Sequence, residues 1–99
     1  MTPRPTALDD AAVAAVMAAP DAPAWHLVDG MLVKTVECSS FPAALDFVMV
    51  VGRLAEEANH HPDIDIRWRK VRLALVTHDA GGLTELDITM ARDIDSLSP

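Results

Sequence analysis

The stretch WHLVDGMLVKTVE, residues 25–37, decides the fold that we expect for this chain. It holds two largely apolar runs, Trp25–Val28 and Met31–Glu37, separated only by Asp29 and Gly30. Both central positions of a tight hairpin turn require a positive φ, and Asp-Gly accepts that conformation more readily than most residue pairs. The stretch therefore predicts two antiparallel strands joined by a two-residue turn.

A second hairpin is predicted over residues 64–78. Residues 64–68 alternate between apolar and charged side chains, which is the period of a half-buried strand. The next strand alternates in the same way. One face carries Val71, Leu73, Leu75 and Thr77, and the other carries Arg72, Ala74, Val76 and His78. We expect the turn near Arg69 and Lys70, although these residues are poor turn formers.

Three helices complete the pattern. The first is predicted over Leu8–Ala19, with Pro20 after it, and the second over Phe41–Asn59, between a cap at Ser39 or Ser40 and a stop at Pro62. The last follows a cap at Thr84, with Leu83 and Ile88 at the positions of a hydrophobic staple and Asp87 at the third helical position. The order predicts an α+β two-layer sandwich, α-β-β-α-β-β-α, with helices on one face of a four-stranded antiparallel sheet.

The second helix is apolar over most of its circumference. Its polar residues Asp46, Arg53 and Glu57 recur at intervals of seven and four, so they occupy one narrow strip. Such a helix must be covered on more than one side. We therefore expect a second copy of the protein to supply the extra cover, as a homodimer or homotetramer.

Composition limits the class of protein. Ninety-nine residues, 51% of them hydrophobic, predict a single globular domain over residues 1–99, with loose ends at 1–6 and 97–99. The net charge of −7 disfavours nucleic acid and anionic membranes as partners. The single cysteine, Cys38, and the absence of a long apolar segment favour the cytoplasm.

One local basic cluster runs against the net charge. Arg67, Arg69, Lys70 and Arg72 lie within six positions. They either form a solvated hairpin edge that is protected from aggregation by its charges, or dock an anionic ligand or an acidic partner. The sequence leaves both interpretations open.

Four polar features are candidates for chemistry: Glu56, the His60-His61-Pro62 step, His78 and Asp87. Each has a structural explanation, such as a solvated helix residue, a histidine at a helix C-terminus or a helix cap. The predicted fold favours a functional explanation over these structural ones, because a hairpin places the start of its first strand beside the end of its second. His61 and His78 are then neighbours at one end of the sheet, and Asp87 can return to the same end.

Clustered histidines indicate either a metal ion or proton transfer. Adjacent residues at a helix end point about 100° apart, so His60 and His61 are poorly placed to hold one ion together. The sequence has neither HExxH nor a Cys-His metal spacing. We therefore expect no metal, and acid–base chemistry by imidazole, whose ordinary pKa of about 6.5 lies nearest neutrality.

The spacing of these residues resembles the signature of the pterin-4a-carbinolamine dehydratase family. Three residues separate Glu56 from His60-His61-Pro62, five more lead to Trp68, nine to His78 and eight to Asp87. The resemblance covers about three quarters of the chain. It implies the same α-β-β-α-β-β-α domain, a metal-free cytoplasmic dimer or tetramer with no cofactor, and dehydration of 4a-hydroxytetrahydropterin to quinonoid dihydropterin and water. That reaction recycles the pterin of aromatic amino-acid hydroxylases, one of which is a possible partner.

The resemblance also implies roles for the matching residues. His60 and His78 are expected to perform acid–base catalysis, and His61 to hold and orient the pterin. Glu56 is expected to orient a histidine, and Asp87 to support the site while it also serves its helix. Trp68 stands at an aromatic position of the family, and we expect it to shape the pocket wall.

Two functional hypotheses follow. The first is the hydro-lyase. The second is a non-enzymatic binding module, because proteins of this fold also act as a dimerisation cofactor for a transcription factor and as an assembly chaperone for the carbon-fixing enzyme. The full set of histidines favours the enzyme, whereas the basic 67–72 cluster and the acidic first helix keep a binding role open.

Overall fold

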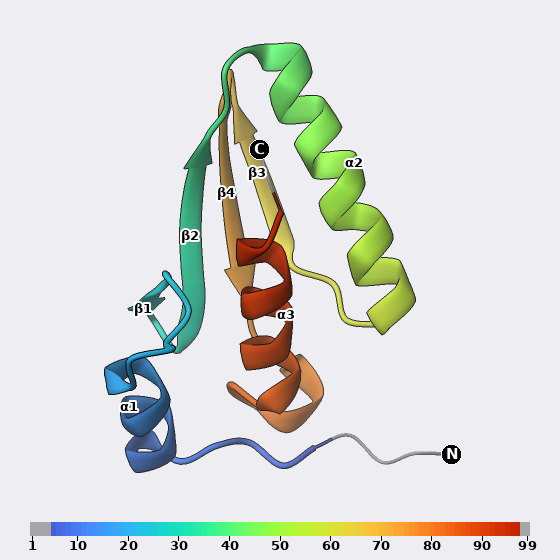
Figure 1. The fold of residues 1–99 in the computed structure, drawn as a ribbon. Coiled ribbons are helices and arrows are strands. Elements are labelled where there is room, and N and C mark those ends of the chain that lie inside the picture. The colour runs from blue at the N-terminus through green and yellow to red at the C-terminus, as the bar shows by residue number, and fades with distance from the viewer. Residues whose placement is uncertain (1–4, 98–99) are drawn as a thin grey trace.

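The computed structural model describes residues 5–97, which form an open four-stranded sheet and helices that cover one of its faces (Figure 1). The elements in chain order are α1 (Asp10–Ala18), β1 (His26–Val28), β2 (Met31–Glu37), α2 (Phe41–Ala58), β3 (Asp63–Arg67), β4 (Lys70–Leu75), the short 3-10 helix η1 (His78–Ala80) and α3 (Glu85–Asp95). The strand order is β1-β2-β4-β3, and every neighbouring pair is antiparallel. The predicted α+β fold is confirmed.

The first hairpin forms at the Asp-Gly turn as predicted. Asp29 and Gly30 have φ values of 50° and 79°, and Val28 pairs with Met31 on either side of them. Continuing from this turn, β2 pairs along its length with β4. The local turn preference therefore starts the central part of the sheet.

The second hairpin turns one residue earlier than expected. Arg67 pairs with Lys70, so Trp68 and Arg69 form the turn, and Trp68 takes a left-handed φ of 53°. The expectation of a turn at Arg69 and Lys70 is wrong, because Lys70 already belongs to the ladder of β4. Its place there keeps Val71, Leu73 and Leu75 on the inner face, where all three are completely buried.

The core lies between the sheet and α2 and α3. The inner stripe of α2 consists of Ala44, Phe47, Val51 and Ala55, and α3 contributes Ile88, Met90, Ala91 and Ile94. In α1 only Val13 is buried, and that helix starts at Asp10 because the Asp9 side chain caps it by accepting a hydrogen bond from the Ala12 N–H. Leu8, expected inside the first helix, precedes it and packs against the core.

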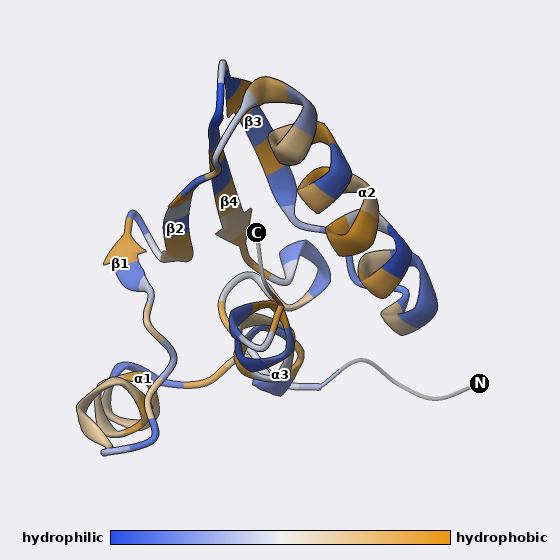
Figure 2. Cartoon of the chain, turned by 45° about the horizontal axis from the view of Figure 1, so that its top comes forward, coloured by the Kyte–Doolittle hydropathy of each residue, from blue (hydrophilic) through white to orange (hydrophobic). Residues whose placement is uncertain are grey.

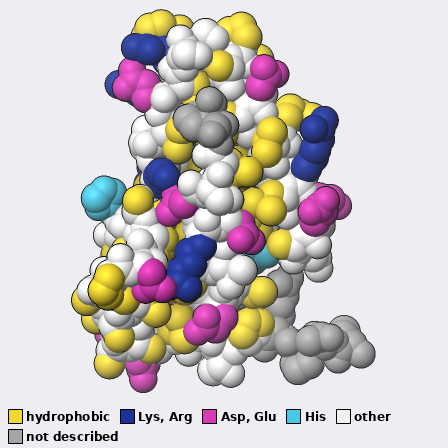
Figure 3. Space-filling view, in the orientation of Figure 1, with side chains coloured by type: hydrophobic (Ala, Val, Ile, Leu, Met, Phe, Trp, Pro, Cys, Tyr) yellow, Lys and Arg dark blue, Asp and Glu magenta, His cyan; other side chains and the backbone are white. Residues whose placement is uncertain are grey.

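The opposite side of α2 leaves apolar side chains in solvent. Phe41, Leu45, Met49 and Val50 are 42–57% exposed. Figure 2 shows hydrophobic residues over much of this helix, and Figure 3 shows apolar side chains on the surface of the molecule. Cover by a second copy stays a prediction.

The ends of the second and third helices depend on local capping. Ser40 caps α2, and Pro42 lies in its first turn. The helix ends at Ala58, one residue before the predicted end at Asn59, because Asn59 adopts a left-handed conformation. Thr84 and Asp87 form the predicted capping box of α3, and the staple residues Leu83 and Ile88 are both buried.

The described part of the chain differs from the expected loose ends in one respect. Leu97 packs against the core, although it was expected to be loose; residues 1–4 and 98–99 lie outside the described residues.

Within residues 5–97, no helix is both long and apolar enough to cross a membrane. In the basic cluster, Arg67 and Arg69 form ion pairs with Asp65 and Glu37 of the same chain, at 3.0 and 2.8 Å.

Candidate active site

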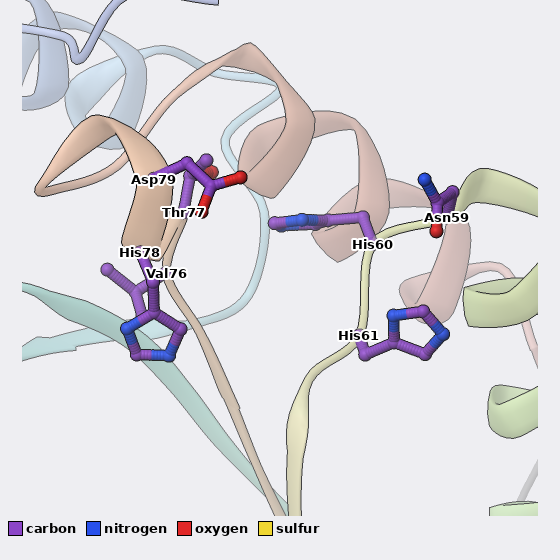
Figure 4. A pocket seen from close by; sticks show the side chains of 7 residues that line it. All are labelled: Asn59, His60, His61, Val76, Thr77, His78 and Asp79. Atoms are coloured by element: carbon purple, nitrogen blue, oxygen red, sulfur yellow. The ribbon is translucent and has the colours of Figure 1, made fainter. Parts of the chain in front are cut away.

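A pocket of about 210 Å³ lies where the end of α2 meets the segment between β4 and α3 (Figure 4). It is lined by Asn59, His60, His61, Val76, Thr77, His78 and Asp79. Three of the four histidines of the chain are therefore brought together, as the hairpin argument predicted.

The end of α2 explains why two adjacent histidines face different surroundings. The left-handed Asn59 reverses the chain, while its N–H bonds to the Glu56 carbonyl and the His60 N–H bonds to the Ala55 carbonyl, which is the pattern of a Schellman motif. This turn directs His60 inward, where it is 6% exposed, and leaves His61 on the surface.

His60 is held by a buried carboxylate. Its Nε2 lies 2.6 Å from Oδ1 of Asp87, which is completely buried. The other oxygen of Asp87, Oδ2, accepts hydrogen bonds from the Thr84 N–H at 2.9 Å and from the Thr77 hydroxyl at 2.8 Å. Asp87 therefore caps α3 and orients His60 with the same carboxylate group.

The surrounding hydrogen bonds determine which atom donates in each contact of the network around His60. The Leu86 N–H donates to Thr84 Oγ1, which lies 2.8 Å from Thr77 Oγ1. Since the Thr77 hydroxyl donates to Asp87, the Thr84 hydroxyl donates to Thr77. An ionised Asp87 only accepts, so His60 carries hydrogen on Nε2 and leaves Nδ1 available to a ligand.

His61 and Glu56 form a second, exposed pair. The two side chains are 57% and 81% exposed, and His61 Nε2 lies 2.8 Å from Glu56 Oε2. Figure 4 shows the His61 ring turned away from His78, whereas His60 reaches toward Thr77 and Asp79. The carboxylate that orients His61 is therefore Glu56, one helical turn earlier in the chain.

His78 lies across the pocket from these pairs. It was expected at the end of a strand, but β4 stops at Leu75 and His78 opens η1. The reason is the tight loop in which Thr77 pairs with Gly82 as an isolated bridge and Gly81 takes a φ of 76°. The His78 side chain is exposed and makes no hydrogen bond to the described part of the chain.

Within one chain Trp68 does not line this pocket. Its expected role in shaping the pocket wall stays a prediction. The β3–β4 turn lies at the end of the hairpin opposite the segments of His60 and His78 (Figure 1). The Trp68 side chain is 67% exposed, and the Arg69 guanidinium lies 4.8 Å from its ring centroid.

The site predicted from the sequence did not include Thr77, nor the hydrogen bond that the Thr84 hydroxyl makes to Thr77 in addition to capping α3. Thr77 lies two residues beyond the end of β4, where it continues the inward alternation of Val71, Leu73 and Leu75, and it is 3% exposed. A hydroxyl on a buried apolar face requires a hydrogen-bond partner, which was the available signal. Among the described residues, no group of three or more His, Cys, Asp or Glu side chains is arranged to hold a metal ion.

The fold and the pocket define a class of protein, a small α+β domain with three histidines at one end of its sheet, two of them paired with carboxylates. The family model for pterin 4 alpha carbinolamine dehydratase matches residues 6–97. The chain belongs to this pterin-4-alpha-carbinolamine dehydratase family.

Similar sequences agree with this assignment. A protein of Chloroflexus aurantiacus, named as a candidate pterin-4-alpha-carbinolamine dehydratase, is 56% identical over 75 residues, which cover 76% of this chain and 81% of that protein. A Mycobacterium tuberculosis protein of the same name is 53% identical over 73 residues, covering 74% of this chain and 78% of its own length.

Two solved structures share the fold. A protein from Brucella melitensis, described as a transcriptional coactivator/pterin dehydratase, has a TM-score of 0.82 at 29% identity and covers 92% of this chain and 97% of its own. A pterin dehydratase-like RuBisCO assembly factor of the alpha-carboxysome has a TM-score of 0.61 at 24% identity and covers 73% and 86%. The second likeness shows the fold alone.

Proposed function

We propose that this protein is a hydro-lyase that dehydrates 4a-hydroxytetrahydropterin to quinonoid dihydropterin and water. The observation that carries the proposal is the buried His60–Asp87 pair, which faces a pocket shared with two further histidines, in a chain of this family. The proposed physiological role is recycling of the pterin used by aromatic amino-acid hydroxylases in the cytoplasm.

The reaction requires two proton transfers. A base removes the proton from N5, the electron pair forms the C4a=N5 double bond, and the C4a–O bond breaks. An acid protonates the departing hydroxyl, which leaves as water. No electrons are exchanged with the surroundings, so the proposed reaction needs no redox cofactor, and positioned acid–base groups contribute about 10²–10⁴-fold each.

His60 is proposed as the base. Asp87 keeps the hydrogen of the His60 ring on Nε2, so the lone pair of His60 Nδ1 is available for the N5 proton. Asp87 also stabilises the imidazolium that forms, since a carboxylate favours a neighbouring positive charge. Asp87 is thus a positioning residue that acts through His60.

His78 is proposed as the acid that protonates the leaving hydroxyl. Its side chain has no partner in the described part of the chain, so it is free to turn toward a ligand. His61, oriented by Glu56, is proposed to hold the ring at the rim of the pocket. The two proton carriers then approach the pterin from two different segments of the chain.

The test is a direct dehydration assay on chemically generated 4a-hydroxytetrahydropterin, followed by the absorbance of the quinonoid product. His60→Ala and His78→Ala are each expected to lower kcat at least tenfold. His26→Ala is the matched control, because His26 lies exposed on β1 and does not line the pocket. Full activity of a folded His60→Ala, His78→Ala double variant would disprove the assignment.

A binding module is the second candidate, and the exposed apolar side of α2 favours it. Similar structures are described as a transcriptional coactivator and as an assembly factor. If binding is the function, the double histidine variant retains it, whereas Met49→Lys, which places a charge among the exposed apolar side chains of α2, abolishes it.

A further inference from the structure

A second cavity lies between the first half of α1, the β1–β2 turn and the loop that precedes α3 (Figure 1). We call it the α1 cavity. Its volume is about 530 Å³, within the roughly 300–1,000 Å³ usual for a ligand site, whereas the histidine pocket measures about 210 Å³. The two cavities share Val76 in their linings, but none of the three clustered histidines lines the α1 cavity.

The walls of the α1 cavity are held together by the fold. The Leu8 N–H donates a hydrogen bond to the Leu83 carbonyl at 2.7 Å, which joins the segment before α1 to the loop before α3. Val13 of α1 and Leu83 form a buried apolar floor, at 9% and 5% exposed. The cavity is therefore built from segments that are fixed to one another and to the core.

The exposure of Leu27 shows that the sheet lacks cover at this place. Leu27 stands opposite Leu32 in the β1–β2 ladder, and directly opposite residues share one face of a sheet. Leu32 is completely buried, but Leu27 is 48% exposed and lines the α1 cavity. A molecule with an apolar body that occupied the cavity would remove this surface from water, which is favourable.

Two carboxylates line the same cavity. The side chains of Asp10 and Asp29 make no hydrogen bond or ion pair within the described part of the chain. Asp9 rather than Asp10 caps α1 through the Ala12 N–H, and the turn at Asp29 depends on its backbone conformation. Among the described residues that line the cavity there is no lysine, arginine or histidine. Two negative charges beside an apolar wall thus lack a cation.

We propose that the α1 cavity binds an organic cation, a primary amine whose apolar body has the size of an aromatic ring or larger. The ammonium group contacts the carboxylates of Asp10 and Asp29, and the apolar body packs against Leu27 and the floor of the cavity. A bare metal ion fits this lining poorly, because hard cations take six or more oxygen ligands and most of the lining is apolar. The proposal does not rest on the dehydratase activity.

Charge selectivity is tested with three probes that share a phenyl ring, namely phenethylamine, phenethyl alcohol and hydrocinnamate. Binding to the full chain is followed by the shifts of its ¹⁵N-labelled amides. The amine is expected to bind with a Kd of roughly millimolar, and to shift the amides of residues 7–14, 27–30 and 81–83. The alcohol is expected to bind about four- to twenty-five-fold more weakly, since each exposed carboxylate contributes about two- to fivefold.

Two results of this titration would overturn the proposal. One is equal affinity for the amine, the alcohol and the carboxylate, because the site would then have no preference for a cation. The other is a set of shifts centred on residues 59–61, which would place the amine in the histidine pocket.

Variants test the two carboxylates. Asp10→Asn and Asp29→Asn are each expected to weaken binding of phenethylamine about two- to fivefold, and to leave binding of phenethyl alcohol unchanged. Asp46→Asn is the matched control, because Asp46 is exposed on α2 and does not line the cavity. Wild-type affinity for the amine in the double variant Asp10→Asn, Asp29→Asn would exclude the proposed contacts.

The apolar part of the site is tested by filling it. Ala14→Phe places a ring in the α1 cavity and is expected to abolish binding of the amine, whereas Ala15→Phe, exposed on the same helix but outside the lining, should retain it. Undiminished binding by a folded Ala14→Phe protein would refute the location. Salt gives a test on the unaltered chain: between low and high ionic strength the amine should lose affinity and the alcohol should not, and an amine affinity independent of salt would contradict the proposal.

Discussion

Replacement of Asp87 by asparagine tests how the buried network controls His60. In the wild-type protein, Asp87 Oδ2 accepts from the Thr84 N–H and the Thr77 hydroxyl, and Oδ1 accepts from His60. The Thr84 N–H can only donate, so the amide oxygen of the variant must take the Oδ2 position. The amide NH₂ group then faces His60 Nε2 and donates to it.

The expected result is a change of tautomer without a change of fold. His60 accepts at Nε2, carries its hydrogen on Nδ1, and presents a donor where the proposed base needs a lone pair. The substitution removes the acid–base contribution of one group, so kcat is expected to fall about 10²–10⁴-fold. The capping box of α3 retains both of its bonds.

The stability cost is smaller than the catalytic cost. A hydrogen bond to a charged group contributes about 1.5–3 kcal/mol and a neutral one about 0.5–1.5. All three bonds of residue 87 weaken, but a neutral amide costs less to bury than a carboxylate and offsets part of this loss, so Asp87→Asn should destabilise by about 1–2 kcal/mol. For a domain of this size that lowers Tm by about 4–16 °C. Asp87→Ala instead leaves three buried donors unsatisfied, at about 1–3 kcal/mol each, which approaches the total stability of a small domain.

The assay combines kcat, thermal unfolding by circular dichroism and the ¹⁵N shifts of His60, which distinguish the two tautomers. Asp93→Asn is the matched control, because Asp93 is an exposed carboxylate on the same helix and lies outside both the buried network and the pocket. A folded Asp87→Asn protein with wild-type kcat, or with hydrogen still on His60 Nε2, would refute this reasoning.

Three further predictions concern other parts of the chain. His78→Ala is expected to lower kcat at least tenfold and leave Tm within about 2 °C, since the side chain is exposed and unpaired within the described residues; a large loss of Tm would contradict this. Burial alone would raise the pKa of Asp95, but hydrogen bonds from Lys34, the Ala24 N–H and Trp25 hold that pKa below its ordinary value of 3.8. The wild-type protein should therefore be about 1–3 kcal/mol more stable than Asp95→Asn in urea at pH 7, and this difference should vanish as the pH falls through the lowered pKa; a difference independent of pH would count against it. Gly30→Ala, at a φ of 79° with no atom within 4 Å of the new methyl group, should cost about 1–2 kcal/mol through backbone strain alone, and an unchanged urea midpoint would exclude that strain.

Local signals predicted the elements well where backbone chemistry acts over a few residues. The Asp29-Gly30 turn, the Ser40 cap and the Thr84–Asp87 capping box all form. Each depends on a conformational or hydrogen-bond preference within three or four residues, which tertiary packing did not oppose. The hairpin argument also brought His61 and His78 to one pocket, since strand order follows from these turns.

Boundaries were predicted less well where two signals compete. The second helix was predicted to run to Asn59 ahead of the stop at Pro62, but the left-handed Asn59 ends it one residue earlier, at Ala58. The turn at Trp68 and Arg69 was missed because neither residue is a usual turn former. Here the buried face of β4 sets the register, and the turn adopts the conformation that remains.

The sequence by itself determined the order of elements, the antiparallel sheet and the meeting of three histidines, because these follow from short-range preferences and from the alternation of side chains. Only the tertiary structure decided which histidine is buried, which carboxylate orients each one, and that Trp68 stands far from the pocket of its own chain. The reason is that the directions of His60 and His61 depend on a reversal at Asn59, and the partner of His60 comes from a helix 27 residues later. The spacing of residues along the sequence therefore does not predict this contact.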